Sequence, residues 1–176
     1  ALALGTSTLT VDGTSLDAAA MVDGSVTITG GTIAIKAGSD TEIDFNGNTI
    51  PALSNADDGS HLLSDLTVGS YTGADNGVLS LDDNAGAPQD LTITGDVTLG
   101  DEDGFTSGGD DGIVTVSGAS TWTFDGDVNI SNLVVDAAVT WAGDANAGVQ
   151  IDAELTIGED GTLALGGDTD LLMGTL

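Results

Sequence analysis

The chain has 176 residues, enough for one domain, and its 29 acidic residues against a single basic one give a formal net charge of −28. With Lys36 as its only base it cannot neutralise phosphates, which excludes nucleic acids and anionic membrane surfaces as partners. It has no cysteine and no apolar run of the roughly 18 residues that a membrane-spanning helix needs, so we expect no disulfide, no thiolate metal site and no membrane insertion.

Short strand patterns recur along the whole chain, and Gly, Asp, Asn or Ser residues separate them. In each pattern Val, Ile or Leu alternates with Thr, Ser or another small residue, which is typical of a strand with one buried side. Only 3% of the residues are aromatic, so aliphatic side chains must fill a narrow core. In chain order the patterns lie at 8–11, 26–29, 32–35, 42–45, 66–68, 78–81, 91–94, 97–99, 113–116, 121–124, 128–130, 133–135, 139–141, 149–151, 155–157 and 162–165.

The C-terminal half contains a repeat. Taking Leu91, Ile113, Leu133 and Leu155 as equivalent strand starts gives spacings of 22, 20 and 22 residues. Each start is followed by a strand, a tight break, a second strand and a variable acidic stretch. This period predicts stacked coils with the four residues in one inward column. Upstream starts near Leu9, Val26, Ile50 and Leu66 are less regular.

The repeat predicts an all-β fold, a right-handed parallel β-helix (β-solenoid) of about eight short coils stacked at roughly 4.8 Å. We expect a single β-rich domain over residues 1–176, with irregular coils at 1–90 and regular coils at 91–176. Glycine would supply the backbone angles at the corners, and Asp would bind exposed backbone amides there. The alternative is an antiparallel β-sandwich or jelly roll with a donated strand, which also joins short strands by turns.

Two stretches, LTITGDVTLGDEDG at 91–104 and GASTWTFDGDVNISN at 118–132, carry a resemblance to known families. They resemble the β-helical repeat regions of bacterial surface adhesins and autotransporter-type passengers, and equally the shaft repeats of bacteriophage tail fibres and spikes. The likeness covers about residues 85–170 and lies in composition and rhythm. It implies a structural role outside the cell or on a virion surface, and it carries over no catalytic residue.

Calcium is the cofactor that the acidic loops favour, because Ca²⁺ prefers hard oxygen ligands on flexible loops. Neither an EF-hand nor the glycine-rich nonapeptide calcium repeat is matched, and solvated acidic turns are the alternative reading. The candidate ligands lie in the loops 55–60 and 100–112, and they are Asp57, Asp58, Asp101, Asp103, Asp110 and Asp111.

Three further residues are of types that often act in catalysis or binding, namely one histidine and two tryptophans. His61 is the only histidine and lies near Ser60, but the spacing matches no nucleophile motif, so we interpret it as a loop residue. Trp122 and Trp141 both alternate with Thr, which places them together either in the core or on one outer face. We favour the core or a subunit contact over a sugar-binding platform.

These observations predict a non-enzymatic, secreted structural protein that assembles with itself head-to-tail into a surface filament, sheath or fibre. Paired carboxylates are frequent, but with few aromatic residues and one base they do not indicate a glycosidase. The alternatives are an adhesin or carbohydrate-binding module that contacts a surface glycan, and a fibre or decoration protein of a virion. The apolar segments at the two ends supply the expected assembly residues, Leu2, Leu4, Leu9, Val11, Leu171, Leu172 and Met173.

Overall fold

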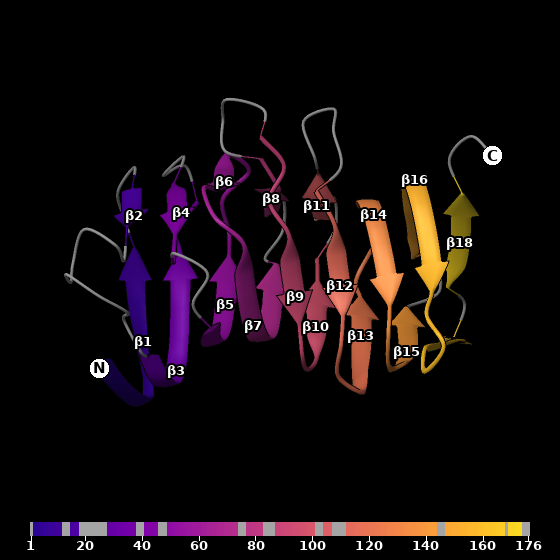
Figure 1. Cartoon of the computed structure of the whole chain (residues 1–176), viewed down its shortest axis with the longest axis horizontal. Helices are drawn as coiled ribbons and strands as arrows, with labels where there is room; N and C mark the ends of the chain where they lie inside the picture. The colour runs from indigo at the N-terminus through magenta and orange to yellow at the C-terminus, as the bar shows by residue number, and fades with distance from the viewer. Residues whose placement is uncertain are drawn as a thin grey trace.

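The protein, described by a computed structural model, is a row of β-strands with β1 at one end and β18 at the other (Figure 1). Every regular element in the described residues is a strand, and no helix there is long and apolar enough to span a membrane. The structure describes residues 2–11, 15–17, 28–37, 41–45, 49–73, 77–82, 87–100, 104–106, 112–143, 147–167 and 169–173.

The strands form three faces, and on each face successive strands pair in parallel. The first face is built from the starts of the strands β1, β3, β5 and β7, from the two short strands β9 and β12, and from the ends of the strands β14 and β16. The bounds of these strands are β1 (Leu2–Val11), β3 (Ile28–Ile35), β5 (Thr49–Asn55), β7 (Leu66–Gly73), β9 (Leu91–Ile93), β12 (Val114–Val116), β14 (Val128–Val135) and β16 (Gly148–Ile157).

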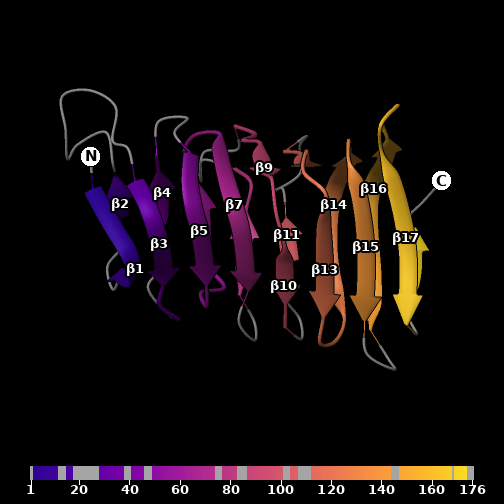
Figure 2. The same ribbon diagram turned by 90° about the horizontal axis from the view of Figure 1, so that it is seen from below.

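The second face continues the chain around a corner, and Figure 2 shows its strands side by side. It contains the ends of β1, β3, β5 and β7, followed by β10 (Val97–Leu99), β13 (Ser120–Phe124), β15 (Ala138–Gly143) and β17 (Thr162–Gly167). The third face contains β2 (Ser15–Asp17), β4 (Glu42–Asp44), β6 (Ser60–Leu62), β8 (Val78–Ser80), β11 (Gly104–Thr106), the starts of β14 and β16, and β18 (Asp170–Met173).

This arrangement is an all-β parallel solenoid, as the repeat predicts. All pairings between the named strands are parallel, and the antiparallel pairing in the described residues is an isolated bridge between Asp82 and Pro88. The antiparallel sandwich alternative is therefore wrong. The described strands make about five turns. The predicted count of eight coils is not confirmed.

Aspartate side chains join the corners of successive coils. The Asp90 carboxylate accepts the N–H of Ile113 at 3.1 Å, and the Asp96 carboxylate accepts the N–H of Thr121 at 2.8 Å. Asp127 binds Gly148 of the following coil in the same way at 3.0 Å. In each case the carboxylate belongs to one coil and the donor to the next, so these bonds satisfy amides that the strand ladders leave over.

The core consists of columns of inward side chains that run along the solenoid axis. On the first face Leu91 pairs with Val114, Val114 with Leu133 and Leu133 with Leu155. The predicted column is therefore wrong at one member, since Val114 takes the inward position and Ile113 precedes it. The two residues are both apolar, and the alternation of Val114, Thr115 and Val116 sets which of them faces inward.

Aromatic side chains fill the second half of the core. Trp122 and Trp141 are fully buried, pair across β13 and β15, and stack with ring centroids 6.5 Å apart. This confirms the prediction that they lie together in the core. Phe124 meets Trp141 edge-on at 5.4 Å, and Phe105 meets Trp122 at 6.4 Å. The rings thus form one cluster that spans several coils.

Candidate functional site

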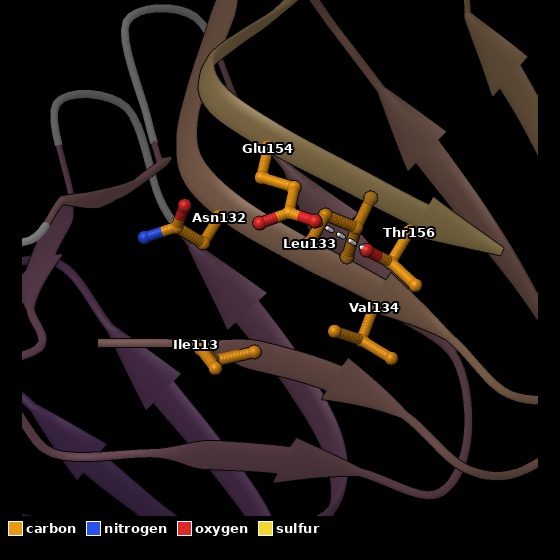
Figure 3. A pocket seen from close by; sticks show the side chains of 6 residues that line it. All are labelled: Ile113, Asn132, Leu133, Val134, Glu154 and Thr156. Carbon is orange, nitrogen blue, oxygen red and sulfur yellow. Dashed lines mark hydrogen bonds between the residues drawn. The ribbon is translucent and has the colours of Figure 1, made fainter. Parts of the chain in front are cut away.

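A hollow of about 340 Å³ lies on the outer side of the first face. Figure 3 shows its lining side chains, with Glu154 beside Thr156 and with Ile113 and Val134 on the opposite side. β12, β14 and β16 border it, so it spans three successive coils. Its lining residues are Ile113, Asn132, Leu133, Val134, Glu154 and Thr156. We call it the first-face hollow.

The outer side of the first face consists of two columns of side chains. One column occupies the position just before each inward leucine or valine, and the other occupies the position just after it. The two columns follow from the strand registers, and they are Asp65, Asp90, Ile113, Asn132 and Glu154 in the first and Thr67, Thr92, Thr115, Val134 and Thr156 in the second.

Each column is polar except at one position. Ile113 stands where its neighbours in the column, Asp90 and Asn132, carry an acid and an amide. Val134 stands where the other members of its column carry threonine. These two departures lie on adjacent coils, and both side chains line the first-face hollow. The hollow therefore has an apolar floor on an otherwise polar surface.

Polar groups surround that floor. The Asn132 amide nitrogen donates to the carbonyl oxygen of Gly112 at 3.3 Å, which fixes the amide at the rim. The Thr156 hydroxyl donates to Oε1 of Glu154 at 3.0 Å, a bond that Figure 3 shows as a dashed line. Glu154 is exposed, and among the described residues it is the one carboxylate that lines the hollow. A ligand there would meet an apolar surface, an amide, a hydroxyl and one negative charge.

The predicted calcium loop at 55–60 forms a buried corner in the structure. Asp57 is fully buried, and its Oδ2 accepts hydrogen bonds from the Ser60 hydroxyl at 3.0 Å and from the Thr41 N–H at 3.3 Å. The Asn55 Oδ1 accepts the Asp57 N–H at 3.3 Å and lies 3.1 Å from the Ser60 hydroxyl, so it shares that hydroxyl's single proton with Asp57. These hydrogen bonds form a buried network that stabilises the corner. The neighbouring Asp58 is exposed.

The other predicted calcium ligands lie outside the described residues, namely Asp101, Asp103, Asp110 and Asp111. In the part of the chain that the structure describes, no three histidine or acidic side chains gather closely enough to hold a metal ion. Calcium binding therefore stays a prediction, and its test is a measurement on the whole chain.

His61 and Ser60 point to opposite sides of β6. Ser60 is buried and bonds to the corner network, whereas His61 is partly exposed and its Nδ1 lies 2.9 Å from Oδ1 of Asp82. Adjacent residues in a strand alternate between faces, so this serine and this histidine cannot act on the same group. The pair of His61 and Asp82 joins β6 to the segment that follows β8.

The predicted assembly residues fall on the two end coils. Leu2, Leu4, Leu9 and Val11 lie in β1, and Leu9, which pairs with the buried Ile33, is 37% exposed. At the other end Leu171 packs partly against the core, while Leu172 and Met173 are exposed.

Sequence reasoning missed Ile157 and Leu165 on the last coil, which are 45% and 50% exposed. The sequence did hold a usable signal, because both residues continue inward columns. Ile157 pairs with the buried Val135, and Leu165 pairs with the buried Trp141.

No protein family, curated protein or solved structure matches this chain. The likeness to adhesin and tail-fibre repeats therefore remains an expectation from rhythm and composition. What the chain does must be argued from its own residues.

Proposed function

We propose that this chain is a non-enzymatic, secreted structural protein of a cell or virion surface that assembles head-to-tail through the two ends of its solenoid. The observation that carries the proposal is that side chains of the inward columns are exposed on the last coil. Ile157, Leu165 and Met173 continue the columns of Val135, Trp141 and Ile151, which are all buried. The core thus reaches the surface at this end, as it would at a subunit contact.

The backbone supports the same contact. Among the described residues β17 pairs with β15, and β18 pairs with β16, so each leaves one edge to accept another strand. At the opposite end β1 pairs with β3, and β2 pairs with β4. Because both ends present strands of the same faces, a second copy stacked on the last coil would continue each parallel ladder. Such a heterologous contact propagates into a filament unless its rotation closes a ring.

The corner carboxylates give the contact a direction. Asp90, Asp96 and Asp127 each accept an N–H from the following coil. On the last coil the acids Glu154 and Asp170 hold the equivalent column positions. In a head-to-tail stack they would face the amides of the first coil of the next copy.

The proposal includes a right-handed winding of about eight coils in each copy.

Charge sets the condition for assembly. A net charge of −28 on each copy repels the next one, and this repulsion weakens as salt shortens the Debye length from about 30 Å at 0.01 M to about 8 Å at 0.15 M. Calcium bound by the acidic loops would act in the same direction. We therefore expect a monomer at low salt and longer particles as salt or calcium is added.

The test compares two leucines of the last coil. Leu165 faces inward and Leu172, which pairs with the exposed Gln150, faces outward, yet both are about half exposed. Light scattering should show that Leu165→Ser abolishes salt-induced growth, whereas Leu172→Ser leaves it unchanged. Deleting residues 1–11 should also abolish it. A full chain that stays monomeric at high concentration with salt and calcium would refute the proposal, as would equal effects of the two leucine variants.

A further inference from the structure

The first-face hollow has the composition of a ligand site, and two of its lining residues, Glu154 and Thr156, belong to the last coil. Its floor is made of Ile113 and Val134, the two apolar members of otherwise polar columns. Neither side chain is required by the core, because both point outward from strands whose inward positions are already filled by Val114, Leu133 and Val135. Both side chains are half-buried, and outward apolar side chains that gather in a concavity are typical of a binding surface.

The charge of the chain decides which ligands can approach. A net charge of −28 repels anions, so phosphates, sulfates and carboxylates are excluded. Neutral sugars are disfavoured as well, since the side chains of all six aromatic residues are buried and none offers a ring to a sugar face. A bare metal ion would gain nothing from the apolar floor, and the described residues supply the hollow with one carboxylate.

We propose that the first-face hollow binds a primary ammonium group carried on an aliphatic stem, such as the side chain of a lysine or a free alkylamine. The stem lies on Ile113 and Val134, and the ammonium group lies between Glu154 and Asn132. An ammonium has three donors. The Glu154 oxygen that does not accept from Thr156, the Asn132 amide oxygen and the Thr156 hydroxyl oxygen are the three acceptors at this rim.

The contributions of the parts can be ranked. An exposed ion pair contributes little alone, and the apolar floor adds about fourfold in affinity for each methylene group that it removes from water. A short cation without a stem therefore binds weakly, and so does a neutral alcohol that has the stem but no charge. Both parts together define the ligand, and the ligand chemistry is distinct from the general attraction of cations to an acidic surface.

The experiment is a titration of the full chain at about 0.15 M salt, where long-range attraction is largely screened. Backbone amide NMR signals are followed with n-pentylamine, with Nα-acetyl-lysine methylamide, with methylammonium and with n-pentanol. We expect saturable shifts at residues 113, 132–134 and 154–156 with the two long-stemmed amines. Binding of n-pentylamine alone assigns the hollow to free amines, and binding of both extends the assignment to lysine side chains of a polypeptide.

Matched variants make the test specific. Glu154→Gln should weaken binding about two- to fivefold, the range of an exposed ion pair. Glu159→Gln removes the same charge from an exposed residue that does not line the hollow, and it should leave binding unchanged. Val134→Thr restores the threonine of its column and should weaken binding about two- to fourfold. Circular dichroism confirms that the variants fold, since all three positions are outside the core.

Three outcomes would overturn the inference. If methylammonium bound as tightly as n-pentylamine, the apolar floor would have no part in binding. If n-pentanol bound as tightly as n-pentylamine, the charge would have no part in it. If Glu154→Gln and Glu159→Gln weakened amine binding equally, the binding would reflect only the net charge of the chain. The titration uses dilute protein at a concentration where scattering shows a monomer, so failure here leaves the head-to-tail proposal standing, and failure of that proposal leaves this one standing.

Discussion

The strand register makes a quantitative prediction for alanine substitution at Leu91. Its side chain is fully buried, and its column neighbours Leu66 and Val114 are buried as well. Truncation to alanine removes the transfer free energy of the lost groups and leaves a cavity. The parallel ladders fix the spacing of the coils above and below, so the cavity cannot collapse fully. We therefore expect Leu91→Ala to lower the free energy of unfolding by about 3–5 kcal/mol, near the top of the known range.

Ile113→Ala is the matched control, because it removes a similar volume one coil further along. Ile113 is half-buried and points outward beside the first-face hollow, so we expect a loss of about 1 kcal/mol. Urea denaturation followed by circular dichroism measures both values, and hydrogen exchange shows whether the coils open together or locally. A cost at Ile113 equal to that at Leu91 would refute the observed register and restore Ile113 to the inward column.

Three further predictions concern corners and charge. Asp90→Ala removes the acceptor of the Ile113 N–H and should cost about 0.5–1.5 kcal/mol in urea denaturation, whereas Asp90→Asn, which keeps an acceptor oxygen, should cost less. Gly118→Ala places a methyl group against the carbonyl oxygen of Thr94, so its melting temperature should fall clearly, while Ala119→Ser at the next, exposed position should leave it unchanged. The melting temperature of the unmodified chain should rise with added salt or calcium, and an unchanged curve after exhaustive chelation and desalting would remove the calcium hypothesis.

The fold could be read from the sequence because the same local pattern recurs with a short period. The two strands that begin at Leu91 and Val97 are each three residues long, and a short break that contains Gly95 and Asp96 separates them. Strands this short cannot bury much surface alone, so they favour a fold in which each is covered by equivalent strands of neighbouring coils. The prediction that Trp122 and Trp141 share the core follows from the same alternation, since each lies between outward neighbours.

Two features could not be read from the pattern. The strands β2, β6 and β11 contain sequences such as SLD, SHL and GFT, which carry no β-branched run, and their strand state comes from pairing with adjacent coils. The inward register at Ile113 and Val114 was also ambiguous, because two adjacent apolar residues satisfy either choice. The first-face hollow depends on that choice, so no sequence argument could have assembled its lining.

In a solenoid the inward and outward positions of a strand are subject to different requirements. Inward positions must be apolar to build the core, so an apolar residue there says only that the coil is folded. Outward positions of the first face carry no such requirement, and Thr and Val, which are both β-branched, fit a strand about equally well. Replacing the column threonine by Val134 therefore gains nothing for the strand, and it exposes an apolar side chain to water. Since Ile113 departs from its own column on the adjacent coil, the two half-buried apolar residues lie at one place on the outer side of the first face. The proposed contact with an alkylammonium ligand would account for this coincidence, since the strand itself accepts threonine at the same position.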